Sequence, residues 1–143
     1  MTSTMHEAAP VRLGPSTSVW VGRVISGLVI AFFVMDAGMK IPPLDAVIDA
    51  MRDLGWPVDP ATSRALAALM LIFTALYAFP LTSVLGAILI TAYLGGAVAT
   101  HVRIGSPLLT HTLFGVYLGI LTWLGLWLRN PQLRAVLPIL LPR

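Results

Sequence analysis

A few ionisable and phenolic side chains interrupt the long apolar runs of this sequence, and they are the residues that could do chemistry. They are Asp36, Lys40, Tyr93, His101, Arg103, His111 and Tyr117. Carboxylate, ammonium, guanidinium, imidazole and phenol groups can hold the oxygen atoms of a small ligand and exchange protons with it. Asp36 and Lys40 have the i, i+4 spacing of a local ion pair on a helix. Such a set does chemistry only where the fold brings its members together.

The elements that must position these residues are predicted to cross a membrane. Of the 143 residues, 57% are hydrophobic and 10% are charged, whereas soluble domains carry about 25% charged residues. Asp, Glu, Lys and Arg are absent from residues 65–100 and from residues 104–128. The sequence has no cysteine, which excludes disulfide, thiolate and iron–sulfur chemistry. We therefore predict an integral membrane protein.

The apolar runs divide into four predicted spans, at residues 19–39, 61–79, 81–100 and 107–128. One crossing needs about 20 helical residues, so the uncharged stretch 65–100, about 54 Å long as one helix, is too long for one span. Pro80 supplies the break, because proline loses the N–H and clashes with the previous turn. The runs do not alternate as barrel strands do. The predicted fold is all-α, an integral membrane four-helix bundle over residues 19–138, with a flexible N-terminal tail at 1–18 and a C-terminal tail at 139–143.

A short amphipathic helix is predicted between the first two spans, within residues 41–59. Its apolar positions recur at helical spacing and are Leu44, Val47, Ile48, Met51 and Leu54. Three aspartates and one arginine occupy the other face. Such a helix lies on the membrane surface, caps the bundle, or serves as a solvated connector.

Antiparallel threading of four spans brings the ends of the first and third spans and the start of the fourth to one membrane side. The ionisable candidates then share one level, and the two tyrosines lie deeper. An ionisable group below the membrane interface costs several kcal/mol unless it is paired or hydrated, so Asp36 needs a partner. Lys40 is the nearest partner, and Arg103 is the best partner from another helix, because its planar fork can bind a carboxylate bidentately.

Two interpretations of this cluster stay open. In the first, Asp36 and Lys40 form a local pair that anchors the end of a span, and nothing binds there. In the second, the ionisable candidates form the polar mouth of a pocket, and Tyr93 and Tyr117 line its interior. The head group of a quinone, or another small lipophile, would suit such a pocket.

Other cofactors and partners fit these residues less well. Haem would need His101 and His111 as axial ligands, yet both lie close to the membrane surface and a short loop separates them. No metal site is predicted, since zinc would want a third ligand and the membrane part contains no glutamate. Ser106 lacks the surroundings of a hydrolase nucleophile. The nine lysines and arginines lie at segment ends, which is typical of topology signals and not of nucleic-acid binding.

Small residues mark the predicted contacts between helices. Gly115 and Gly119 form a GxxxG pair on the fourth span, and Gly95 and Gly96 lie on the third. Glycines let two helix backbones approach closely in a membrane. We expect them to pack helices within one bundle, and dimerisation is the alternative.

The basic residues also predict an orientation, with both termini on the same side of the cell membrane. The side of the termini carries Arg12, Arg23, Arg129, Arg134 and Arg143. The other side carries Lys40, Arg52, Arg64 and Arg103. Positive residues are more frequent in cytoplasmic segments, so the termini are expected in the cytoplasm.

The chain resembles the DoxX-like family of small four-helix membrane proteins. The resemblance rests on Gly22-Arg23 opening the first span, on the DAGMK stretch of residues 36–40, and above all on AYLGGAVATHVR at residues 92–103. Pro107 and the Arg-Asn-Pro sequence after the last span, residues 129–131, continue it. The likeness extends over about residues 19–138.

The resemblance implies a four-helix membrane bundle, and the family takes its name from a component of quinone-linked oxidation. We therefore expect an accessory or ligand-binding bundle with a polar pocket for a lipophile such as a quinone. The expected partners are membrane lipid and either a partner subunit or further copies of the chain. The alternatives are the catalytic subunit of a quinone-linked membrane oxidoreductase, with Asp36 and His101 handling protons, and a small transporter.

Overall fold

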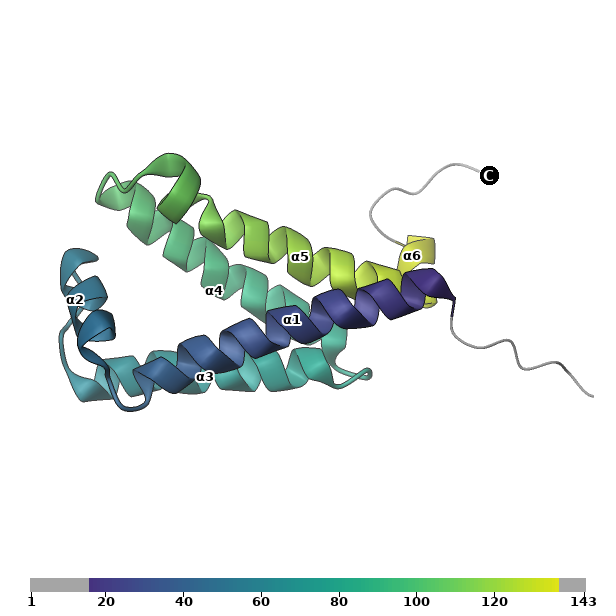
Figure 1. Cartoon of the computed structure of the whole chain (residues 1–143), viewed down its shortest axis with the longest axis horizontal. Helices are drawn as coiled ribbons and strands as arrows, with labels where there is room; N and C mark the ends of the chain where they lie inside the picture. Colours follow the sequence, from purple (N-terminus) through teal and green to yellow (C-terminus); the bar gives the residue numbers. More distant parts are fainter. Residues whose placement is uncertain (1–15, 137–143) are drawn as a thin grey trace, which may run out of the picture.

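The computed structural model describes residues 16–136, and this part of the chain is helical without strands. Four helical segments are long and apolar enough to cross a membrane. They are α1 (Thr17–Lys40), α3 (Pro60–Ala78), α4 (Ser83–Arg103) and the segment Leu108–Arg129, which consists of η1 (Leu108–Thr112) and α5 (Phe114–Arg129). The predicted all-α membrane bundle is therefore confirmed (Figure 1).

The ends of α3 follow from local chemistry. The Asp59 carboxylate caps its first turn by accepting hydrogen bonds from the Thr62 N–H at 2.8 Å and the Thr62 hydroxyl at 2.7 Å. The bonds from the Thr62 side chain and backbone lower the pKa of Asp59. Pro60 occupies the first turn, where its missing N–H costs nothing. At the other end, Pro80 breaks the apolar stretch into two helices as predicted.

The turn between α3 and α4 is longer than the sequence indicated. Leu81 and Thr82, which were expected within the third span, lie in the turn, and α4 begins at Ser83. The Thr82 hydroxyl donates to the carbonyl of Leu76 at 2.7 Å and thereby satisfies a carbonyl in the last turn of α3. This bond ties the turn between α3 and α4 to the last turn of α3.

The fourth span is not one regular α-helix. It starts with the π-helical turn η1, in which the Leu113 N–H bonds the carbonyl of Leu108 at 2.8 Å. A π-turn inserts an extra residue and shifts the helical phase of the residues after it. After α5 the chain turns at Asn130 and forms the short helix α6 (Pro131–Val136), which the sequence reasoning did not predict.

The four membrane helices form a ring in which α1 contacts α3 and α5, and α4 contacts α3 and α5. The pairs α1–α3 and α4–α5 come together at the end that carries the start of α1 and α6, and they diverge at the other end (Figure 1). We name these the narrow end and the wide end. The core runs between them and includes Val29, Phe33, Met70, Tyr77, Ile90 and Leu126.

The predicted short helix between the first two spans is α2 (Asp45–Asp53), and it lies at the wide end (Figure 1). Met51, on its apolar face, is buried, whereas Asp45, Asp49 and Asp53 are exposed. Gly55 ends this segment in the left-handed region at φ 70°, which glycine adopts without strain. The predicted short helix is thus present, and it lies at the wide end of the bundle (Figure 1).

Candidate functional site

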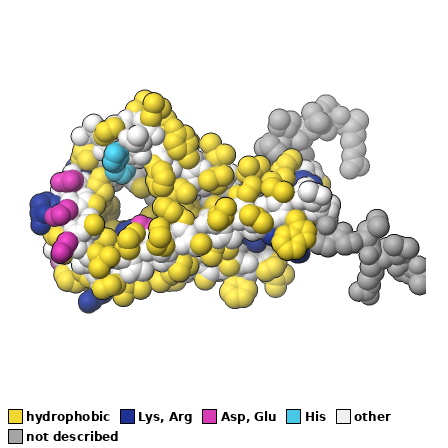
Figure 2. Space-filling view, viewed as in Figure 1, with side chains coloured by type: hydrophobic (Ala, Val, Ile, Leu, Met, Phe, Trp, Pro, Cys, Tyr) yellow, Lys and Arg dark blue, Asp and Glu magenta, His cyan; other side chains and the backbone are white. Residues whose placement is uncertain are grey.

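The wide end of the bundle is hollow. Figure 2 shows an opening between α2 and the diverging helices, with acidic and basic side-chain atoms inside it and histidine at its rim. The opening is also visible in the burial of side chains along α4. The inward positions are buried as far as Leu94, whereas Ala97 and His101, which continue the same face, are only half-buried. Beyond Leu94 no residue of α4 is fully buried.

Asp36 and Lys40 bring an ion pair to this end from the last turns of α1. The Lys40 Nζ donates to Asp36 Oδ2 at 2.5 Å, and the side chains are only 17% and 27% exposed for Lys40 and Asp36. The backbone of the pair is fixed as well, since the Ser63 hydroxyl of α3 donates to the carbonyl of Lys40 at 2.8 Å. The local pair expected from the i, i+4 spacing is therefore present.

Tyr93 approaches the same place from α4. Its side chain is half-buried, packs against the core, and lies within electrostatic reach of Asp36. The phenol and the carboxylate thus belong to different helices that face each other across the bundle.

Arg103 does not reach Asp36. Its Nη2 donates to the carbonyl of Leu54 at 2.6 Å, so it ties the end of α4 to the loop after α2. A Cβ at Gly55 would lie 3.2 Å from the same nitrogen, which shows how closely the loop approaches the guanidinium. The predicted partnership of Arg103 with Asp36 is replaced by this contact, because the end of α4 diverges from α1 and Lys40 already neutralises the carboxylate.

The two histidines lie together at the rim. Their ring centroids are 6.0 Å apart. The Nδ1 of His101 is hydrogen-bonded to the Ser106 hydroxyl at 2.9 Å, and the Nδ1 of His111 to the Thr110 hydroxyl at 2.8 Å. His101 is half-buried and His111 is exposed. The Nδ1 atoms are thus engaged locally, which leaves the Nε2 atoms to face other groups.

Tyr117 lies elsewhere. Its side chain is 44% exposed on the outer surface of α5, so it does not line the opening as the sequence reasoning expected. The inward residues of α5 are instead Gly115, Leu118 and Thr122. Of the predicted site residues, Asp36 and Lys40 are thus in direct contact, His101 and His111 lie near each other, and Arg103 contacts the loop after α2.

The narrow end holds a polar cluster that was not predicted from the sequence. Tyr77 is fully buried, and its hydroxyl donates to the carbonyl of Thr122 at 2.8 Å and shares a hydrogen bond with the Ser26 hydroxyl at 3.0 Å. Arg129 lies 4.7 Å from the centre of the Tyr77 ring and donates to the Tyr77 carbonyl at 2.7 Å. These contacts join α1, α3 and α5 and hold the narrow end closed.

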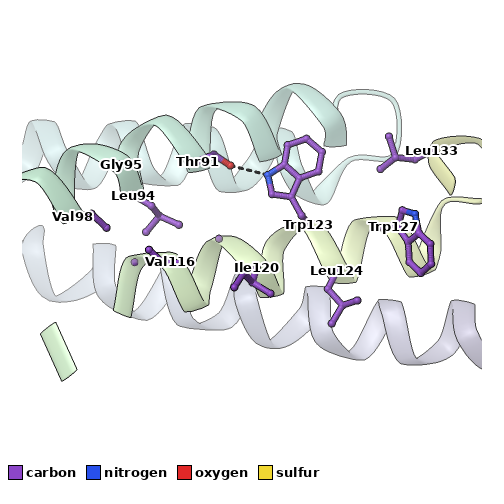
Figure 3. Close-up of a pocket in the computed structure, with 12 residues that line it drawn as sticks. Thr91, Leu94, Gly95, Val98, Val116, Ile120, Trp123, Leu124, Trp127 and Leu133 are labelled. Atoms are coloured by element: carbon purple, nitrogen blue, oxygen red, sulfur yellow. Dashed lines mark hydrogen bonds between the residues drawn. The ribbon is translucent and has the colours of Figure 1, made fainter. Parts of the chain in front are cut away.

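A second hollow lies on the outside of the bundle between α4 and α5, and we name it the α4–α5 groove (Figure 3). Its volume is about 1010 Å³. It is lined by Thr91, Leu94, Gly95, Val98, Gly115, Val116, Gly119, Ile120, Trp123, Leu124, Trp127 and Leu133. The Trp123 indole N–H donates to the Thr91 hydroxyl at 2.9 Å across it, so the two helices are bridged there.

The predicted packing glycines fall into two groups. A Cβ at Gly115 would lie 2.9 Å from Val98 Cγ2, and one at Gly119 would lie 3.9 Å from Leu94 Cδ1, so both residues contact α4. A Cβ at Gly95 or Gly96 would meet nothing within 4 Å. The expectation of close helix packing thus holds for Gly115; a Cβ at Gly119 would make an ordinary van der Waals contact, and Gly95 and Gly96 face open space.

Comparison with known proteins places the chain in a family. The model of the DoxX-like family matches residues 24–125, which include all four membrane helices except the outermost turns. No curated protein and no solved structure matches the chain. The four apolar helices and the family match together make this a multi-pass integral membrane protein. The chain therefore belongs to the DoxX-like family.

Proposed function

We propose that this protein binds a small lipophile with an oxygen-bearing head group, such as a quinone, at the wide end of its bundle. The observation that carries the proposal is the Asp36–Lys40 ion pair, which is largely covered although it stands at the end of a membrane helix beside the opening. Ionisable residues inside the membrane region are costly, and those that face a bundle interior commonly mark a ligand pathway.

The chemistry of the opening suits carbonyl or hydroxyl oxygens. An ammonium group has three donors, and Asp36 occupies one donor of Lys40, so the others can bind a ligand carbonyl. The Tyr93 hydroxyl can donate to a second oxygen or accept from it. Phe33 stands about one turn before Asp36 on α1 and Leu94 follows Tyr93 on α4, and both belong to the core, against which an apolar ring would pack.

Binding is the role that these side chains supply. Each of them holds an oxygen atom or exchanges a proton with it, so the protein would bind and orient its ligand, alone or for a partner subunit. The position of the opening at the end of the membrane helices lets a lipophile enter from the bilayer while its head group stays near water.

A titration of the purified protein in detergent with ubiquinone-1, followed by calorimetry, tests this function. We expect saturable binding that Tyr93→Phe weakens by roughly two- to tenfold, because a lost hydrogen bond costs about 0.5–1.5 kcal/mol. Tyr117→Phe is the matched control, since Tyr117 lies on the outer surface. Asp36→Asn, which removes the negative charge beside Lys40, should also change the affinity.

The proposal fails if the folded wild-type protein shows no saturable binding of ubiquinone-1. It also fails if Tyr93→Phe and Tyr117→Phe bind as tightly as the wild type. The thermal unfolding midpoint of each variant is measured in the same detergent, so that a loss of binding can be separated from a loss of fold.

We infer further that the narrow end, where the first and last described residues lie, faces the cytoplasm of the cell. The support is the excess of basic residues predicted on that side, among them Arg23, Arg129 and Arg134. The sequence has no cysteine, so thiol labelling of a single-cysteine variant reports on the introduced position alone. A membrane-impermeant maleimide should label Asp53→Cys but not Ser16→Cys in intact cells, and the reverse labelling would overturn the orientation.

A further inference from the structure

We propose that the α4–α5 groove and Arg134 form a binding site for one anionic phospholipid. In this site a hydrocarbon chain of the lipid lies along the groove, and its phosphate faces the guanidinium of Arg134 at the narrow end. The site is separate from the opening at the wide end and does not rest on the function proposed for that opening.

The groove has the chemistry of a hydrocarbon site. No lining residue is charged, and the Thr91 hydroxyl and the Trp123 indole N–H bond each other (Figure 3). Its volume of about 1010 Å³ lies at the upper end of the range for small-molecule pockets, about 300–1,000 Å³. Gly95 contributes to this space, since a Cβ there would meet nothing within 4 Å.

The position of the groove makes a lipid its natural occupant. It runs along the outer side of two membrane-spanning helices, from Val98 and Gly115 toward Trp127 and Leu133. A surface of this kind faces the acyl chains of the bilayer. A chain held there fills a space that the helices leave empty, and close van der Waals contact drives association within a membrane.

Arg134 adds a charge at the narrow end of the groove. Its guanidinium lies 5.9 Å from the centre of the Trp127 ring, and both Trp127 and the neighbouring Leu133 line the groove. Its Nη1 makes a long hydrogen bond to the Ser18 hydroxyl at 3.4 Å, its Nε is buried, and no ion pair found among residues 16–136 involves it. The terminal nitrogens of a guanidinium carry further N–H donors, and phosphate is the anion that their geometry fits.

The charge distribution favours an anion at this end. In the described part of the chain, every carboxylate belongs to the far turns of α1, to α2 or to the start of α3, and the acidic atoms gather at the wide end in Figure 2. Arg23, Arg129 and Arg134 lie at the narrow end, and the ion pairs found between described residues involve none of them. A membrane supplies the missing negative charge as lipid phosphate, and basic pockets between membrane helices bind such head groups.

Native mass spectrometry of the protein in detergent, with equal amounts of phosphatidylglycerol and phosphatidylcholine added, tests the proposal. We expect one retained phosphatidylglycerol. Gly95→Leu fills the groove and should reduce retention of either lipid at least fivefold. Gly96→Leu is the matched control, because a Cβ at this neighbouring glycine also meets nothing and the residue does not line the groove.

Arg134→Gln tests the head-group contact. It should lower the preference for phosphatidylglycerol about fivefold, since one basic residue near an anionic lipid contributes about that factor. Arg23→Gln removes an exposed charge at the same end outside the groove, so this control should keep the preference. Ubiquinone-1 binding should stay unchanged in all four variants, which separates this site from the wide end.

The proposal is overturned if Gly95→Leu and Gly96→Leu retain lipid equally, if the wild type shows no preference between the lipids, or if the groove is filled in a lipid-free dimer. A measurement on the wild type covers the case in which Gly95→Leu does not fold. Dibrominated phosphatidylglycerol should quench the fluorescence of Trp123 and Trp127 more than dibrominated phosphatidylcholine does, and equal quenching contradicts the site.

Discussion

Gly86→Ala should destabilise the bundle strongly, although it adds only one methyl group. A Cβ at Gly86 would lie 2.2 Å from the backbone nitrogen of Tyr77, 2.5 Å from its Cα and 2.7 Å from the carbonyl carbon of Leu76. Non-bonded carbon atoms prefer separations of about 3.5–4.0 Å. These neighbours are backbone atoms, which no side-chain rotation can move aside, so α3 and α4 would have to separate by roughly 1 Å or more.

That separation has two costs. Overpacking in a well-packed core costs about 1–3 kcal/mol, occasionally more. It would also disturb Tyr77, whose hydroxyl bonds the carbonyl of Thr122 and whose carbonyl bonds Arg129, and each hydrogen bond contributes roughly 0.5–1.5 kcal/mol. We therefore expect the free energy of unfolding to fall by about 3 kcal/mol or more.

Unfolding of the purified protein by sodium dodecyl sulfate in mixed micelles measures this change. Gly96→Ala is the control, because a Cβ at Gly96 meets nothing within 4 Å and alanine favours a helix by up to about 1 kcal/mol over glycine. Gly96→Ala should leave stability unchanged or raise it. Equal effects of the two substitutions would refute the close approach of α3 and α4 at Gly86.

Three further outcomes follow from single contacts. Tyr77→Phe should lower the free energy of unfolding by about 1–2 kcal/mol, because two buried hydrogen bonds are lost. Tyr117→Phe should have no effect, and the same micelle assay measures both variants. The pKa of Asp59 is lowered in the folded state, so its stabilising effect is present above the unfolded pKa of about 3.9 and is lost as pH falls through the folded pKa. Below pH 4 the melting temperature of Asp59→Asn should consequently fall less than that of the wild type. Arg103→Gln removes the bond to the Leu54 carbonyl and should speed amide hydrogen exchange in α2 about fivefold, and unchanged exchange would mean that other contacts hold this helix.

The helices could be predicted from the sequence because their signals are local. The length of an apolar run fixes the number of crossings, and Pro80 and the Asp59-Pro60 pair mark where helices end and begin. The π-turn at Leu108–Thr112 carries no such signal. Its hydrogen bonds depend on how the chain leaves Pro107 and packs against α4, which the order of residues alone does not reveal.

The roles of the glycines show where local reasoning stops. Gly86 and Gly96 lie on the same helix and are equivalent by residue type, yet the first contacts a neighbouring backbone and the second faces open space. Gly22 and Gly125, like Gly86, contact a neighbouring helix closely, and they allow α1 and α5 to approach each other. The side of a helix that meets a neighbour depends on crossing angles and helical phase, and these are properties of the assembled bundle.

The candidate site likewise contains contacts that could be predicted from the sequence and contacts that could not. The Asp36–Lys40 pair follows from spacing on one helix, so the sequence was sufficient to predict it. Tyr117 was placed wrongly because each helical position turns by about 100°, and the inward residues of α5 are its neighbour Leu118 and the following Thr122. The partner of Arg103 was missed because the distance between two helix ends depends on how far the bundle opens.

The sizes of the residues along α1 and α5 explain why the bundle opens at one end. Toward the narrow end, Gly22 and Gly125 let the backbones of the two helices approach each other closely. Toward the wide end, aromatic rings stand at the contact, with Phe32 and Phe114 edge to face at a centroid distance of 5.6 Å. Small residues at one end and rings at the other thus set a short helix separation at the narrow end and a longer one at the wide end. A lipophile bound beside Asp36 and Lys40, as proposed above, would leave the Tyr77 contacts of the narrow end intact.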